Sequence, residues 1–173
     1  SVRTAEAMAA CCRDKGATEI RRARDEEERQ GLWDIRRSIS LRIHDSAPRY
    51  LSEDVVTPLD RIPDLVDELP NIAQIHGLTI YAFGHAGDGN IHVNITGLDE
   101  ADIDQRMDAA VKTCLAKVLD LGGTISGEHG IGLAKLPYIG MELSSESLRI
   151  QRAIKQAFDP GNILNPCKVL PQS

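Results

Sequence analysis

The sequence predicts an α+β fold in which helices pack on one face of an antiparallel sheet, followed by a C-terminal helical tail. Two apolar runs with strand-like character, at 78–85 and 90–96, are joined by the segment AGDG, which is typical of a β-hairpin. A third strand-like run lies at 52–58 and ends at a proline. Helical patterns, with apolar residues every three or four positions, alternate with these runs.

The first part of the chain predicts two helices with a strand between them. Residues 2–15 have the apolar spacing of a helix, and the run ATEIRRA at 17–23 suggests a strand. Acidic residues at 25–28 favour the start of a second helix, which continues to about residue 44, because the helix dipole stabilises negative charge at that end. The expected buried stripe of this helix consists of Leu32, Ile35, Ile39 and Ile43.

The middle of the chain predicts two further helices. Residues 59–76 have a helical pattern, although Pro70 should kink or break the helix. Residues 100–121 form the most regular pattern, with Asp99 as N-cap and Gly122 as the stop signal. The expected buried stripe of this last helix consists of Ile103, Met107, Val111, Cys114, Val118 and Leu121.

The C-terminal part predicts a glycine-rich loop at 122–135, a helix at 144–157 and a tail rich in turns. At the other end, the chain begins directly in an alanine-rich helical pattern without a leading strand or cap. We therefore expect the chain to be the back part of a longer protein.

Composition excludes several classes of function. The formal charge of −6 and the pI of about 5.3 argue against a nucleic-acid partner, which requires a basic face. No apolar run approaches the roughly 18 residues of a membrane span, and the first residues lack the pattern of a signal peptide. The four cysteines form no C-x-x-C pair, which favours idle thiols in a reducing cytosol. We expect a cytoplasmic protein, with peripheral association at a membrane as the alternative.

Two histidines, His85 and His92, flank the glycine-rich turn of the predicted hairpin. His92 and Asn94 are two positions apart and share a face of the strand, and His85 faces the same side if the register permits. Glu128, in the segment GEHG, offers a third ligand, and two histidines with one carboxylate make a metal site that keeps open positions for water or substrate. The alternative is a set of ordinary polar residues on a hairpin and a mobile loop.

Three other polar residues have both a functional and a structural interpretation. His129, flanked by glycines, is suited to proton transfer near neutral pH, or is simply part of a surface loop. Arg36 on the second helix can bind a carboxylate with two hydrogen bonds, although a solvated arginine is the commoner case. Asp88 is expected to stabilise the turn rather than bind a metal.

Three motifs in this order resemble the C-terminal half of the FAD-linked oxidases of the vanillyl-alcohol oxidase type: GHAGDGNIHVNI, GGTISGEHGIGLAK and AFDPGNILNPCKVLP. The most similar branch is that of the D-2-hydroxyacid dehydrogenases, which includes the glycolate oxidase FAD subunit, D-lactate dehydrogenase and D-2-hydroxyglutarate dehydrogenase. The upstream segments LWDIRRSIS and SEDVVTPLDRIPDLV fit as well, so the resemblance covers nearly the whole chain.

The resemblance implies a cap domain derived from a ferredoxin-like fold, which completes the substrate site of an FAD-dependent enzyme. An N-terminal domain of the same polypeptide would hold most of the FAD, and electron-acceptor subunits are possible partners. The substrate would be a small hydroxy acid. The implied roles are metal ligation, most simply of zinc, by His85, His92 and Glu128, proton abstraction by His129, substrate binding by Arg36, Ser40 and Asn94, and proximity to the flavin for Asn165.

Two departures from the family pattern bear on the substrate and the tail. Cys167 stands where the family usually has glycine. Ser52 stands where the hydroxyglutarate branch has a lysine for the distal carboxylate, which favours glycolate or lactate as substrate.

Two other classes of function compete with an oxidoreductase. The same ligand set can activate water in a metal-dependent hydrolase, with His129 as base. Alternatively, the chain is a non-catalytic interaction module whose metal site is structural or empty.

Overall fold

The computed structural model describes residues 2–85 and 87–171, and the chain divides into two compact units, Ser1–Arg42 and Ile43–Ser173. The helices α1 (Val2–Asp14) and α2 (Glu26–His44) confirm the two helices expected at the start of the chain. No described helix is long and apolar enough to cross a membrane.

Two expectations for the first unit are wrong. Residues 17–23 form no strand, because no second strand is available there to complete a backbone ladder, and Arg21 instead pairs with Glu28 of α2, with 2.9 Å between its Nη2 and the carboxylate. The apolar stripe of α2 is not buried either, since Ile35 is 64% exposed and no residue of this helix is buried. Local periodicity predicted this helix correctly but not its packing.

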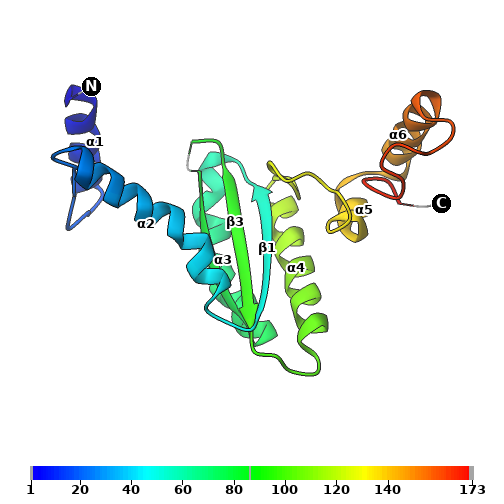
Figure 1. Cartoon of the computed structure of the whole chain (residues 1–173), viewed down its shortest axis with the longest axis horizontal. Helices are drawn as coiled ribbons and strands as arrows, with labels where there is room; N and C mark the ends of the chain where they lie inside the picture. The colour runs from blue at the N-terminus through cyan, green and yellow to red at the C-terminus, as the bar shows by residue number, and fades with distance from the viewer. Residues whose placement is uncertain (1, 86, 172–173) are drawn as a thin grey trace. The chain divides into compact units, whose positions relative to one another are not determined.

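The second unit contains a three-stranded antiparallel sheet (Figure 1). Its strands are β1 (Arg49–Val56), β2 (Thr79–His85) and β3 (Asn90–Gly97), in the order β1-β3-β2. The predicted hairpin is therefore confirmed, and the central strand β3 is buried along nearly its whole length.

Helices α3 (Ile62–His76) and α4 (Ile103–Asp120) pack against this sheet, as Figure 1 shows. Alternate residues of β3 face them and join one hydrophobic core with apolar residues of both helices. The strand residues of this core are Val55, Ile91, Val93 and Ile95. All six residues of the stripe predicted for α4 are buried. Because α3 and α4 cover one face of the sheet, the polar residues of β3 lie on the opposite face.

Two details of the helices differ from expectation, one inside α3 and one at the start of α4. A 3-10 turn at Leu59–Arg61 precedes α3, and the helix continues through Pro70 without a break. Pro70 lies on the exposed side of the helix, so water can bind the backbone carbonyl that the proline leaves without a hydrogen-bond donor. Helix α4 begins at Ile103, and Asp99 is not its N-cap. The Asp99 carboxylate lies 3.2 Å from the guanidinium of Arg49 instead.

The C-terminal region follows the expected order of loop, helix and tail. After the loop come a 3-10 turn at Leu136–Tyr138 and the short helix α5 (Ile139–Glu142). Helix α6 (Ser145–Phe158) confirms the predicted helical tail, and its N-cap Ser144 accepts a hydrogen bond from the backbone N–H of Ser147.

Candidate metal centre

The hairpin places His85 and His92 on the same side of the sheet. His85 is opposite Asn90 in the β2–β3 register, and Asn90, His92 and Asn94 alternate with the apolar core residues of β3. Because directly opposed residues of an antiparallel pair share a face, His85 and His92 lie on the face that α3 and α4 leave open. Their ring centroids are 5.8 Å apart.

The loop after α4 brings Glu128 to these two histidines. Its Oε1 lies 3.4 Å from Nε2 of His92, and the ligand atoms of His85, His92 and Glu128 all lie within 4.8 Å of one another. Two ligands of a tetrahedral zinc ion are roughly 3.3 Å apart, given metal–ligand bonds of about 2.0–2.1 Å. The donor set therefore fits a divalent cation after modest side-chain rotations.

The environment of His92 favours a neutral ring. Burial lowers the pKa of His92, and the neighbouring His129 and His85 lower it further, whereas Glu128 raises it; the net direction is downward. A neutral imidazole keeps the lone pair that a metal ligand needs.

His129 lies next to this cluster. Its ring centroid is 5.7 Å from that of His92, and about half of its side chain (52%) is exposed to solvent. Its Nδ1 lies 3.3 Å from Oδ1 of Asp54. An accessible imidazole beside a candidate metal centre is suited to proton transfer.

Behind the loop is a buried ionic cluster that the sequence did not predict. Asp54 of β1 accepts backbone hydrogen bonds from Gly127, Glu128 and His129 on its Oδ2, at 2.9, 2.6 and 3.0 Å. Its Oδ1 accepts a hydrogen bond of 2.5 Å from Nζ of Lys135. The one signal in the sequence was a pair of acidic residues inside an apolar strand pattern, which is uncommon without a partner.

These partners keep Asp54 ionised. Burial by itself would raise the pKa of Asp54, but the Lys135 ammonium and the backbone N–H groups of His129 and Glu128 outweigh it and lower the pKa to about 2. The neighbouring Glu53 has the opposite balance, since burial raises its pKa more than Lys135 lowers it.

Two glycines are required for close approach around the site. A Cβ on Gly127 would lie 2.4 Å from the Asn90 side-chain oxygen, and a Cβ on Gly89 would lie 2.1 Å from the carbonyl oxygen of Thr57. Gly89 also has a φ of +81°, which disfavours any L side chain. The Asp88 carboxylate accepts the backbone N–H of Asn90, as expected for a turn residue.

Asn94 lies two residues beyond His92 on the same face, as predicted. It is almost completely buried, accepts a hydrogen bond of 2.8 Å from the Tyr50 hydroxyl and donates one of 3.3 Å to the carbonyl of His92. Ser52 is directly opposite Asn94 in the β1–β3 register.

The other predicted contacts lie elsewhere in the chain. Arg36 and Ser40 are four residues apart on α2, with Arg36 half-buried and Ser40 exposed, and both belong to the unit Ser1–Arg42. Their proposed contact with the substrate stays a prediction.

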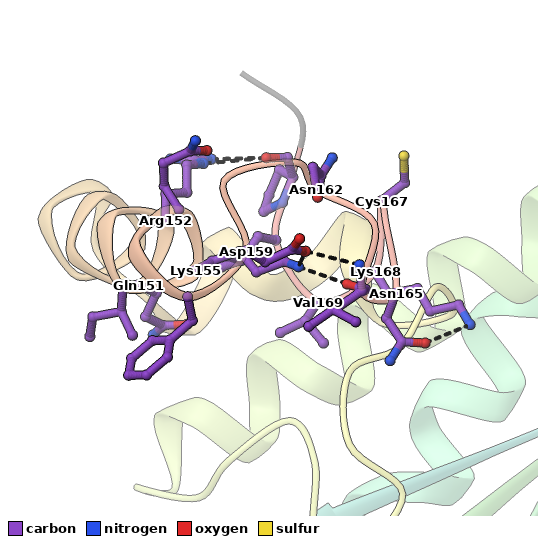
Figure 2. A pocket seen from close by; sticks show the side chains of 15 residues that line it. Gln151, Arg152, Lys155, Asp159, Asn162, Asn165, Cys167, Lys168 and Val169 are labelled. Carbon is purple, nitrogen blue, oxygen red and sulfur yellow. Dashed lines mark hydrogen bonds and ion pairs between the residues drawn. The ribbon is translucent and has the colours of Figure 1, made fainter.

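Asn165 lines a cavity of about 840 Å³ formed by α6 and the tail (Figure 2). The buried carboxylate of Asp159 holds the tail by accepting the backbone N–H groups of Ile163 and Leu164, at 3.0 and 2.9 Å. Cys167 has a φ of +62°, a conformation that favours glycine, the residue expected there from the family pattern. Neither His85, His92, Glu128 nor His129 lines this cavity.

Comparison with known proteins agrees with these motifs. Residues 2–169 match the family described as FAD linked oxidases, C-terminal domain. Glycolate oxidase subunit GlcD of Bacillus subtilis (strain 168) is 38% identical over 168 residues, covering 96% of this chain and 36% of the relative. D-lactate dehydrogenase of Anaerostipes hadrus is 30% identical over 158 residues, which cover 90% of this chain and 33% of the relative. D-2-hydroxyglutarate dehydrogenase of Stutzerimonas stutzeri (strain A1501) is 32% identical over 152 residues, covering 85% of this chain and 32% of the relative.

The chain thus spans about a third of the length of the curated relatives it matches. The match extends from the first described helix through the tail and includes every residue of the candidate metal centre. On these grounds, the chain belongs to the FAD linked oxidases and corresponds to their C-terminal domain.

Proposed function

We propose that this chain forms the metal- and substrate-binding part of an FAD-dependent enzyme that oxidises a small D-2-hydroxy acid to the 2-oxo acid. The observation that carries the proposal is the convergence of His85, His92 and Glu128, with ligand atoms within 4.8 Å of one another and His129 beside them. The relatives named as glycolate oxidase and D-lactate dehydrogenase support the reaction class. The flavin domain is proposed to be part of the same polypeptide.

The ligand set suggests zinc as the divalent cation. Bound there, the cation would act as a Lewis acid toward the substrate hydroxyl, and FAD would accept the hydride from the substrate carbon. Two imidazoles and one carboxylate leave coordination positions open, in contrast to the four protein ligands of a structural zinc site.

The residues of the chain have separate tasks in this proposal. His129 accepts the hydroxyl proton, because its imidazole is solvent-accessible and lies beside the ligand cluster. Arg36 binds the substrate carboxylate with two hydrogen bonds, and Ser40, one turn along α2, adds a polar contact. Asn94 supports His92 through its carbonyl and offers a second amide hydrogen.

The size of the substrate is proposed from Ser52. A short hydroxyl side chain opposite Asn94 offers no positive charge for a second carboxylate. A monocarboxylic hydroxy acid such as glycolate or D-lactate is the substrate class that this position favours. Asn165 is proposed to lie near the flavin through the tail.

The test uses the intact protein in which this chain occurs with its proposed flavin domain. We expect a yellow protein whose flavin absorbance bleaches when glycolate or D-lactate is added without oxygen, and whose metal content by elemental analysis is one divalent ion per chain. L-lactate serves as the matched control substrate. A colourless protein that hydrolyses esters or amides would instead favour the metal-dependent hydrolase, and a metal-free protein would favour a non-catalytic module.

A further inference from the structure

We propose that Asp54 is a positioning residue that fixes the loop carrying Glu128 and His129 and selects which nitrogen of His129 carries the proton. The proposal rests on the proposed function, because it assumes that this loop supplies a metal ligand and the base. The relevant contacts are made by the side chains of Asp54 and Lys135, which are both buried and do not belong to the ligand set.

The first contact is a carboxylate bound by three successive backbone N–H groups. Oδ2 of Asp54 accepts them from Gly127, Glu128 and His129 at 2.9, 2.6 and 3.0 Å. Successive backbone N–H groups of this kind form a concave anion site, which here is filled by a side chain of the sheet. A glycine-flanked loop is thereby tied to β1 at the two residues that do the proposed chemistry.

The second contact holds the carboxylate itself. Lys135 donates from Nζ to Oδ1 of Asp54 and to the Asp54 carbonyl oxygen, at 2.5 Å in both cases. Asp54 is completely inaccessible to solvent and Lys135 is 4% exposed. A charge-assisted pair in such a site leaves the Asp54 side chain one rotamer, so the direction of Oδ2 is fixed.

The third contact concerns the ring of His129. Its Nδ1 lies 3.3 Å from Oδ1 of Asp54. The two atoms are not aligned as a hydrogen bond, but the negative charge of Asp54 at that distance favours the tautomer with the proton on Nδ1, which leaves the lone pair of Nε2 free as the accepting atom. Asp54 therefore determines both where the loop lies and which nitrogen of His129 can act as base.

The test begins with the unmodified, metal-free chain. Nitrogen-15 spectra of the imidazoles, recorded where they are neutral, should give the Nδ1–H tautomer for His129. The amides of residues 127–129 should exchange slowly with solvent in spite of the exposed loop. An Nε2–H tautomer, or rapid exchange of these three amides, would overturn the proposal without any variant having to fold.

The variant is Asp54→Asn, with Asp67→Asn on the exposed side of α3 as the matched control. Asparagine cannot accept from the backbone and Lys135 with both atoms, so we expect loss of amide protection at 127–129, loss of the tautomer preference and a roughly 10–100-fold weaker affinity for Zn²⁺ by calorimetry. Protection of the β3 amides should persist in both variants. An Asp54→Asn protein with unchanged tautomer and Zn²⁺ affinity would contradict the proposal.

Failure of the proposed function can be distinguished from failure of the role proposed for Asp54. If the unmodified chain bound no Zn²⁺, the metal site would be wrong, whereas the tautomer and exchange measurements would still decide the role of Asp54.

Discussion

Asp54 on β1 and Lys135 at the end of the glycine-rich loop form a buried ion pair, with 2.5 Å between Oδ1 and Nζ, although they are 81 positions apart in the chain. The pair lies directly behind the candidate metal centre, since the same carboxylate also binds the backbone of Glu128 and His129. Stability and the geometry of the site are therefore coupled through one side chain.

Alanine substitutions of His129 and His92 should separate metal binding from proton transfer. In the intact enzyme, His129→Ala should lower turnover by about 10²–10⁴-fold while the metal content stays unchanged, because the ring lies beside the ligand set and is not part of it. His92→Ala should lose both metal and turnover. The measurements are steady-state kinetics and elemental analysis, with the exposed His44→Ala as control. Normal turnover of His129→Ala would exclude this residue as the base.

Removing the cation of the buried Asp54–Lys135 pair should lower the free energy of unfolding much more than removing the cation of an exposed pair. Lys135→Met leaves the Asp54 charge buried with only backbone partners, and we expect a loss of about 3–5 kcal/mol in the free energy of unfolding. Lys112→Met removes a surface pair with Asp108 and should cost less than about 1 kcal/mol. Denaturant titration of both variants measures the difference. Equal costs would mean that the buried pair does not stabilise the fold.

The stability of the chain should depend on pH through Asp54. Its pKa in the folded state is about 2, below the ordinary value of about 3.9 expected for the unfolded chain. The stabilisation is therefore fully present above about pH 4 and is lost as the pH falls toward about 2, with a magnitude of about 2 kcal/mol. Unfolding measured over this range should give a smaller slope for Asp54→Asn than for the unmodified chain. Parallel curves for the two proteins would contradict the assignment.

Substitution of Ser52 should change substrate preference. In the intact enzyme, Ser52→Lys should raise kcat/KM for D-2-hydroxyglutarate relative to glycolate, because an ammonium group opposite Asn94 would face a second carboxylate. Ser46→Lys, on the exposed turn before β1, is the control for added charge alone. If both variants kept the original ratio, position 52 would not contact the distal end of the substrate.

Thiol reactivity should follow burial. Burial raises the pKa of Cys114 to about 12, with a smaller contribution from the Glu53 carboxylate, whereas Cys11, Cys12 and Cys167 are exposed. We expect a thiol reagent to label the three exposed cysteines in the folded chain and Cys114 only after denaturation. Mass spectrometry of the labelled protein gives the count, and labelling of Cys114 under native conditions would mean that α4 opens from the sheet.

Short-range pattern predicted much of the second unit. Alternation along a strand has a period of two, which places His92 and Asn94 on the same face. The AGDG turn identified the strand of His85 as the partner of this strand. The helical period likewise predicted the stripe of α4, whose six residues are all buried, although it missed the buried Ala110 and Leu115 beside them. These are local properties of the backbone.

Packing could not be predicted in the same way. The strand expected at 17–23 has no partner there, and the stripe of α2 lies on an exposed helix, because burial depends on what other segments cover an apolar face.

By itself, therefore, the sequence determined the hairpin and the described helices other than the short α5, and it predicted the candidate ligands, since each follows from residues a few positions apart or from a motif. Only the tertiary structure decided that Asp54 and Lys135 meet behind Glu128 and His129. The physical reason is that a buried charge in a strand must be paired with a counter-charge, and here the counter-charge comes from a loop that is distant in the sequence.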